Sequence, residues 1–103
     1  MGFEIIFAEA IRQHLTSIER RPHSLILQTT VEQLRFEPTT ETRNRKPLKR
    51  PIASGATWEL RLGPNNRFRV LYEVWPEDGQ VHILAVGVKQ GNRLLVGGKE
   101  VGL

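Results

Sequence analysis

Cysteine is absent from the chain, which excludes disulfide bonds and thiolate metal ligands. The three histidines (His14, His23 and His82) lie far apart and lack metal-ligand spacing, so we expect no metal and no other cofactor. No apolar run approaches the roughly 20 residues that a membrane-spanning helix needs. The first ten residues carry two glutamates and no basic residue, unlike a secretory signal. We therefore expect a cytoplasmic protein without membrane contact.

Length and charge limit the remaining possibilities. A chain of 103 residues predicts one domain, covering residues 1–103. Lys and Arg outnumber Asp and Glu by 15 to 11, and this balance favours a polyanion or an acidic protein as partner. No nucleophile–base pair, glycine-rich phosphate loop or paired catalytic carboxylate is apparent. Any chemistry must therefore come from a less obvious arrangement of side chains.

The first 38 residues predict one strand and two helices. Residues 3–7 have the composition of a short strand, and residues 8–20 place three aliphatic side chains on one helical stripe. A second helix is expected to begin at Pro22, because proline is tolerated in the first turn, and Pro38 ends it. The two helices are expected to lie antiparallel.

Residues 37–57 differ in composition and predict a loop. They contain three prolines, several threonines and a cluster of basic residues: Arg43, Arg45, Lys46, Lys49 and Arg50. This segment is either a solvated connection or an arm that binds phosphate groups.

From residue 57 the apolar residues recur with a period of two, which predicts strands. Two turn sequences, residues 63–66 and 76–79, divide the segment into a three-stranded antiparallel meander. The glycine-rich tail suggests a further short hairpin at Gly97-Gly98. The predicted fold class is α+β with the order β-α-α-β-β-β, in which two N-terminal helices pack on one face of a mostly antiparallel sheet.

Burial predicts the register of the first hairpin in this meander. If the apolar residues of both strands share the helix-covered face, paired residues have numbers that sum to about 130. Arg61 then lies opposite Arg69 on the uncovered face, where like charges repel. Either an anion normally sits between these arginines, or Glu59 or Glu73 neutralises them. The same alternation points Tyr72, the one tyrosine, and His82 into the core.

The chain resembles the RelE/ParE superfamily of toxins from type II toxin–antitoxin systems. Four segments carry the resemblance: Lys46-Pro47-Leu48, Trp58-Glu-Leu-Arg-Leu-Gly63, Arg67-Phe-Arg-Val-Leu-Tyr72-Glu-Val74 and Val81-His-Ile-Leu-Ala-Val-Gly-Val-Lys89. The similarity extends over nearly the whole chain, and the strand bearing Arg-Val-Leu-Tyr is its centre.

The resemblance implies a metal-independent nuclease that cuts messenger RNA on the ribosome. In such toxins the ribose 2′-hydroxyl attacks the neighbouring phosphate, and basic groups stabilise the charged transition state. By position, Arg69 and Arg61 would stabilise that phosphate. Lys89, at the end of the last long strand, lies near a further basic position of the family and would be the fourth residue of the catalytic site. Glu59 replaces a basic residue of the family and would act as base. The residues expected to hold the RNA backbone are Lys46, Lys49, Arg50, Arg67 and Arg93.

Two alternatives remain open within the same resemblance. A ParE-like protein would bind DNA gyrase and cut nothing, and a degenerate member would only bind its antitoxin. Glu59 and the lack of a C-terminal tyrosine depart from the pattern of the family's nucleases, so both alternatives stay open. In every case we expect an acidic or amphipathic antitoxin segment that covers the basic face. If local carboxylates held both Arg61 and Arg69 in ion pairs, the catalytic hypothesis would lose its basis.

Overall fold

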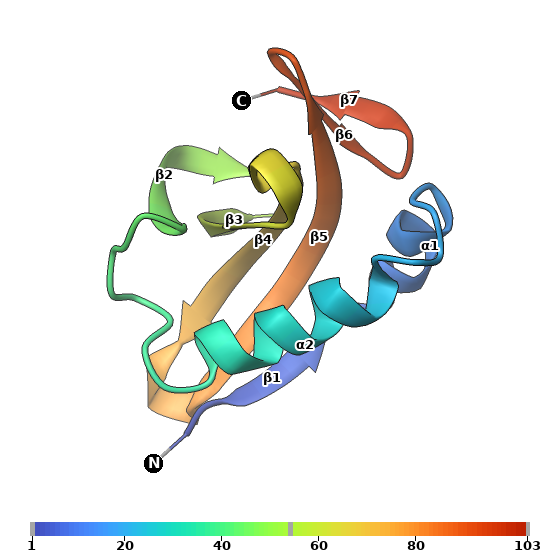
Figure 1. Cartoon of the computed structure of the whole chain (residues 1–103). Helices are drawn as coiled ribbons and strands as arrows, with labels where there is room; N and C mark the ends of the chain where they lie inside the picture. The colour runs from blue at the N-terminus through green and yellow to red at the C-terminus, as the bar shows by residue number, and fades with distance from the viewer. Residues whose placement is uncertain (1, 54, 103) are drawn as a thin grey trace.

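The computed structural model describes residues 2–53 and 55–102. One sheet includes all seven strands found in these residues, and two helices lie against it (Figure 1). Strand β1 (Glu4–Phe7) is followed by α1 (Ile11–Thr16) and α2 (His23–Leu34). The remaining strands then follow in order along the chain: β2 (Arg45–Ile52), β3 (Ala56–Leu62), β4 (Phe68–Trp75), β5 (Gln80–Gln90), β6 (Arg93–Val96) and β7 (Lys99–Val101). No helix within the described ranges is long and apolar enough to cross a membrane.

The sheet is antiparallel along the path β2-β3-β4-β5-β6-β7, and β1 adds to β5 in parallel. In Figure 1 the sheet is strongly curled, with α2 crossing it and the β6–β7 hairpin at the far end of β5. The α+β class, the helix pair, the meander and the hairpin at Gly97-Gly98 agree with the sequence predictions. The predicted order β-α-α-β-β-β was incomplete, because it lacked β2 and did not count β6 and β7.

The segment predicted as a loop contains strand β2, which corrects the assignment of residues 37–57. β2 pairs with β3 through Arg45, Lys46 and Pro47, and again at Ile52 after an irregularity in the register. Proline cannot donate to a strand ladder, so it is found on edge strands and at bulges. β2 is such an edge strand, which explains how it accommodates Pro47 and Pro51.

Helix α1 is shorter than the predicted span of residues 8–20. It covers six residues and carries no side-chain hydrogen bond at its N-cap, Ala10. The chain turns after Thr16, while Ile18 still reaches the core. The imidazole of His23 donates to the carbonyl oxygen of Ile18 at 3.0 Å, which ties the start of α2 to this turn. The apolar stripe was correctly identified, but it extends past the helix.

The predicted register of the β3–β4 hairpin is confirmed. Trp58 pairs with Tyr72, Leu60 with Val70, and Arg61 with Arg69. The turn between these strands requires glycine at position 63, where φ is +83° and a Cβ would lie 2.5 Å from the Phe68 ring. The even-numbered apolar residues of both strands join helix residues such as Ile26 and Leu34 in the main core.

Tyr72 lies in this core as predicted, but His82 does not. Tyr72 is fully buried and stacks on Trp58, with ring centroids 6.2 Å apart. In β5 the register shifts between Ala85 and Ile83, so the alternation reverses at Leu84. Counting back from Val88 therefore gave the wrong side for His82. It pairs with Glu73 and stacks on the exposed Trp75 at 3.9 Å.

Candidate functional site

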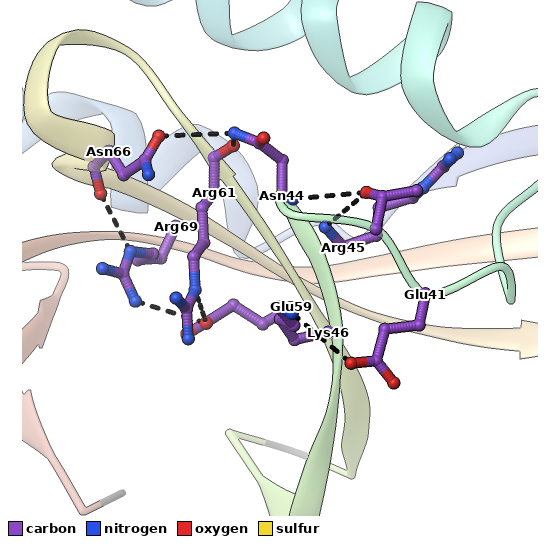
Figure 2. Close-up of polar contacts among 9 residues, drawn as sticks. Glu41, Asn44, Arg45, Lys46, Glu59, Arg61, Asn66 and Arg69 are labelled. Carbon is purple, nitrogen blue, oxygen red and sulfur yellow. Dashed lines mark hydrogen bonds and ion pairs between the residues drawn. The ribbon is translucent and has the colours of Figure 1, made fainter.

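Glu59 is the centre of a charged cluster on the sheet face that the helices leave uncovered. Its Oε1 accepts from Arg61 Nε at 2.8 Å and from Arg69 Nη1 at 3.2 Å (Figure 2). Arg69 Nε also donates to the carbonyl oxygen of Asn66 at 2.9 Å. Glu59 is only 3% exposed, whereas the side chains of Arg69 and Arg61 are 11% and 36% exposed. One oxygen atom thus joins the two guanidinium groups.

The hairpin register explains why this cluster forms. Arg61 and Arg69 are directly opposite each other, and Glu59 lies two residues before Arg61 on the same face. A carboxylate at this position offsets the like-charge repulsion that paired arginines would otherwise experience. Of the two possibilities raised by the sequence, neutralisation by Glu59 is the one observed. Glu73 takes no part, because it accepts from Trp75 Nε1 at 3.0 Å.

A cavity of about 460 Å³ adjoins this cluster on the side of β2. Lys46 lies directly opposite Glu59 in the β2–β3 register, and its ammonium group is 3.4 Å from Glu41. The cavity is lined by charged and apolar residues: Lys46, Pro47, Leu48, Lys49, Arg50, Ile52, Glu59 and Arg61. The structure therefore brings three of the predicted RNA-binding residues beside Glu59 and Arg61.

The other predicted site residues lie outside this cavity. Lys89 follows Gly87, the partner of Arg69, by two residues, so strand alternation places it on the same face as the cluster. Arg67 instead packs over the Phe68 ring and is 3.4 Å from Glu19, between α1 and α2. Arg93 is exposed on the β6–β7 hairpin, 3.8 Å from Glu100. Arg67 and Arg93 thus face separate surfaces.

The buried tyrosine is chemically occupied. The Tyr72 hydroxyl donates to the carbonyl oxygen of Pro38 at 2.6 Å. Burial raises the pKa of Tyr72 well above its ordinary value, and the nearby charge of Arg45 opposes this rise only in part. The hydroxyl is therefore a structural donor. Within residues 2–53 and 55–102 no group of three His, Cys, Asp or Glu side chains could hold a metal ion.

Comparison with known proteins finds a similarity in structure. No family model and no curated protein matches the chain. Among solved structures, one chain of the toxin–antitoxin complex RelBE2 from Mycobacterium tuberculosis superimposes with a TM-score of 0.68 at 26% sequence identity. The match covers 86% of the present chain and 100% of that chain. This similarity in structure supports the resemblance to RelE-like toxins that the sequence indicated.

The RelE-like fold holds the cluster with residues that the sequence alone did not single out. Asn66 has a positive φ of 52° in the turn after β3, which directs its carbonyl oxygen to Arg69. Asn44 Nδ2 donates to the carbonyl oxygen of Arg61 at 2.9 Å and to Asn66 Oδ1 at 3.3 Å. The turn sequence Gly63-Pro64-Asn65-Asn66 was visible, but its contact with residue 44 depends on β2. Missing β2 therefore meant missing this support.

Proposed function

We propose that this chain is the toxin of a toxin–antitoxin pair. The support is its similarity to a chain of RelBE2, a complex of that kind, over nearly the whole length of both. An acidic or amphipathic antitoxin segment would cover the basic surface beside β2 and neutralise it by complementary charge. We expect the gene directly beside the gene for this chain to encode a small DNA-binding protein. That protein should copurify with the chain.

The first candidate target is messenger RNA on the ribosome, cut without a metal in the cytoplasm. The observation behind this proposal is the cavity in which Lys46, Lys49 and Arg50 meet Glu59 and Arg61. Three cationic side chains of β2 provide a path for the RNA backbone, since phosphate contacts dominate nucleic-acid affinity. At its end lies a carboxylate flanked by guanidinium groups.

The proposed reaction is transfer of the phosphoryl group to the neighbouring ribose oxygen. Glu59 takes the proton of the 2′-hydroxyl, and the freed oxygen attacks the adjacent phosphorus. The bond to the 5′-oxygen breaks, and that oxygen takes a proton from solvent or from Lys89. The products are a 2′,3′-cyclic phosphate and a 5′-hydroxyl end. Arg61 and Arg69 offset the charge that develops on the phosphate.

The contacts of Glu59 determine which of its oxygens could accept the proton and which arginine could bind the phosphate. Its Oε1 is taken by both arginines, which leaves Oε2 as the oxygen to accept the proton. Arg61 uses only Nε toward Glu59, so its terminal amino groups remain for a phosphate in the cavity. Arg69, held by Glu59 and Asn66, would orient Glu59 in addition to adding positive charge near the phosphate.

The same contacts favour a second candidate, a RelE-like toxin that cuts nothing. Glu59 holds both arginines in ion pairs, which is the arrangement expected to remove the basis of the catalytic hypothesis drawn from the sequence, a phosphate held between two free guanidinium groups. In this case the basic surface is a protein interface, either for DNA gyrase in the manner of ParE or for the antitoxin alone. Gyrase binding predicts growth inhibition without cleaved messenger RNA, and antitoxin binding alone predicts no growth inhibition.

Induced expression of the wild-type chain and three variants separates these candidates. We expect the wild type to stop growth and to leave new cleavage ends in messenger RNA by primer extension. Arg61→Ala and Glu59→Gln should reduce cleavage at least 100-fold, which is a typical loss for one catalytic group. Arg20→Ala, which removes an exposed charge between the helices, is the matched control and should cut normally. Toxicity with no cleavage ends in the wild type would refute the nuclease proposal.

A further inference from the structure

Arg45 is a buried cation for which the fold supplies little compensation. It is 8% exposed, and its Nη1 donates to the carbonyl oxygen of Gln33 at 2.6 Å. Its Nε is buried without a hydrogen-bond partner, and no carboxylate of the described ranges forms an ion pair with it. Arginine keeps its charge under all ordinary conditions, so burial without a counter-charge is costly.

Arg45 belongs to the opposite side of the sheet from the Glu59 cluster. It pairs with Leu60 in the β2–β3 register, whereas Lys46 pairs with Glu59. In Figure 2 its side chain extends toward α2 and away from Arg61 and Arg69. Gln33 lies in the last turn of α2, whose carbonyl end carries partial negative charge. That end accepts from Nη1, and among the buried side-chain nitrogens of Arg45 it leaves Nε without a partner.

Arg45 lines a second cavity, of about 430 Å³, which is within the roughly 300–1,000 Å³ of small-molecule sites. Its lining is mostly polar and includes the three arginines Arg43, Arg45 and Arg61, with no aspartate or glutamate. Guanidinium groups recognise phosphate by paired hydrogen bonds. The lining is therefore positively charged, and no carboxylate in it balances that charge.

We infer that this cavity binds a phosphate-class anion, with Arg45 at its buried bottom and Arg43 at its exposed rim. Arg61 lines this cavity and also the one beside Glu59, so the two cavities adjoin at that residue. A strand of RNA could place one phosphate in each. The occupant is therefore either a free phosphate or a phosphate of the RNA backbone, and only the second source rests on the proposed nuclease function.

Titration of the ¹⁵N-labelled chain with inorganic phosphate, against chloride at equal ionic strength, tests the site. We expect saturable chemical-shift changes in the amides of residues 42–45 and in the Asn44 and Asn66 side chains, together with a higher melting temperature. Arg45→Met, which keeps the length of the side chain, should weaken phosphate binding at least tenfold. Arg20→Ala removes a charge elsewhere and should bind as the wild type does.

Arg43→Ala provides a second test if Arg45→Met does not fold, because Arg43 is exposed and its loss leaves the core intact. It too should weaken binding. Unchanged phosphate binding in a folded Arg45→Met or in Arg43→Ala overturns the inference, as does a wild-type chain whose shifts do not differ between phosphate and chloride.

A short oligoribonucleotide with non-cleavable 2′-O-methyl sugars distinguishes the two sources. Shift changes at both residues 42–45 and Lys46 would identify the RNA backbone as occupant. Changes with inorganic phosphate alone would identify a free anion, and the inference would stand even if the chain cuts no RNA. Binding of an acidic peptide but of neither phosphate probe would refute it.

Discussion

The two faces of the β3–β4 hairpin are built on opposite physical terms. On the helix-covered face, Leu60 and Val70 pair within a fully buried apolar core. On the other face, one residue away, Glu59 is almost as deeply buried but is held by ion pairs with Arg61 and Arg69. Removing apolar surface from water stabilises the first face. On the second face, the ion pairs must offset the free-energy cost of removing charge from water.

The two faces should therefore differ in the substitutions that they tolerate. An apolar core loses stability whenever volume is lost, whatever the solvent conditions. A charged cluster depends on its partners, so it responds to substitution of a single carboxylate and to a bound anion. The four predictions that follow test this contrast, and they are ordered from the largest expected change in the free energy of unfolding to the smallest.

Leu60→Ala should be the most damaging of these changes. The side chain is fully buried between the helices and the sheet, so truncation leaves a cavity and should cost about 3 kcal/mol of the free energy of unfolding. Urea denaturation measures the loss. Leu25→Ala, at a side chain 46% exposed on α2, is the control and should change the stability by less than about 0.5 kcal/mol. Equal losses in both variants would contradict this account of the core.

Glu59→Gln should cost less, about 1–2 kcal/mol, because the shape is kept while both arginines lose their counter-charge. Freed guanidinium groups should also raise the affinity for a phosphate probe. Glu100→Gln is the matched control, since its pair with Arg93 is mostly exposed and should contribute almost nothing. If denaturation and phosphate titration cannot tell the two variants apart, the Glu59 pairs have no energetic role.

Tyr72→Phe should cost about 1 kcal/mol, because it removes the donor to the buried carbonyl oxygen of Pro38 and keeps the ring packing on Trp58. Denaturation measures this loss, and growth inhibition by the expressed variant should be unchanged. A 100-fold drop in toxicity without loss of the folded protein would give Tyr72 the catalytic role that its burial argues against.

The smallest effect concerns pH and His14. Burial lowers the pKa of His14, and the backbone N–H of Val86 donates to its Nδ1 at 3.3 Å, which requires the neutral ring. The unfolded state therefore binds more protons in the window between the lowered pKa and the ordinary value of about 6.5. The contribution of His14 to stability is complete above about 6.5 and is lost as pH falls through that window.

His14→Asn should remove this part of the pH dependence, since the amide oxygen can accept from Val86 but does not titrate over this range. The measurement is the urea midpoint of both proteins between pH 7 and pH 5. A slope that is identical in the variant would show that other groups cause it.

The sequence predicted the apolar side of this comparison better than the charged side. Strand alternation was enough to pair Leu60 with Val70 and Arg61 with Arg69, because a slip of one residue would expose a whole apolar set. It failed where the backbone departs from regularity. The shift at Leu84 reversed the side of His82, and nothing in the residue types of that apolar run marks it.

The sequence identified several residues of the site but did not predict how their side chains contact one another. Glu59, Arg61 and Arg69 were all identified, and neutralisation by Glu59 was one of two possibilities, but only coordinates could decide between them. The burial of Arg45 could not be foreseen, because it depends on β2, whose prolines suggested a loop. Arg67 and Arg93 show the converse, since basic residues near in sequence point to other surfaces.

The parallel pairing of β1 with the start of β5 has a consequence for how the protein is made. Glu4 and Gln80 are 76 positions apart, and they pair across these strands. Synthesis on the ribosome proceeds from the N-terminus, so Ile5 and Ile6 leave the exit tunnel long before their partner strand has been translated. Contacts of such long range also form slowly. A nascent chain must therefore wait, with its first strand unpaired, until residues 80–83 emerge.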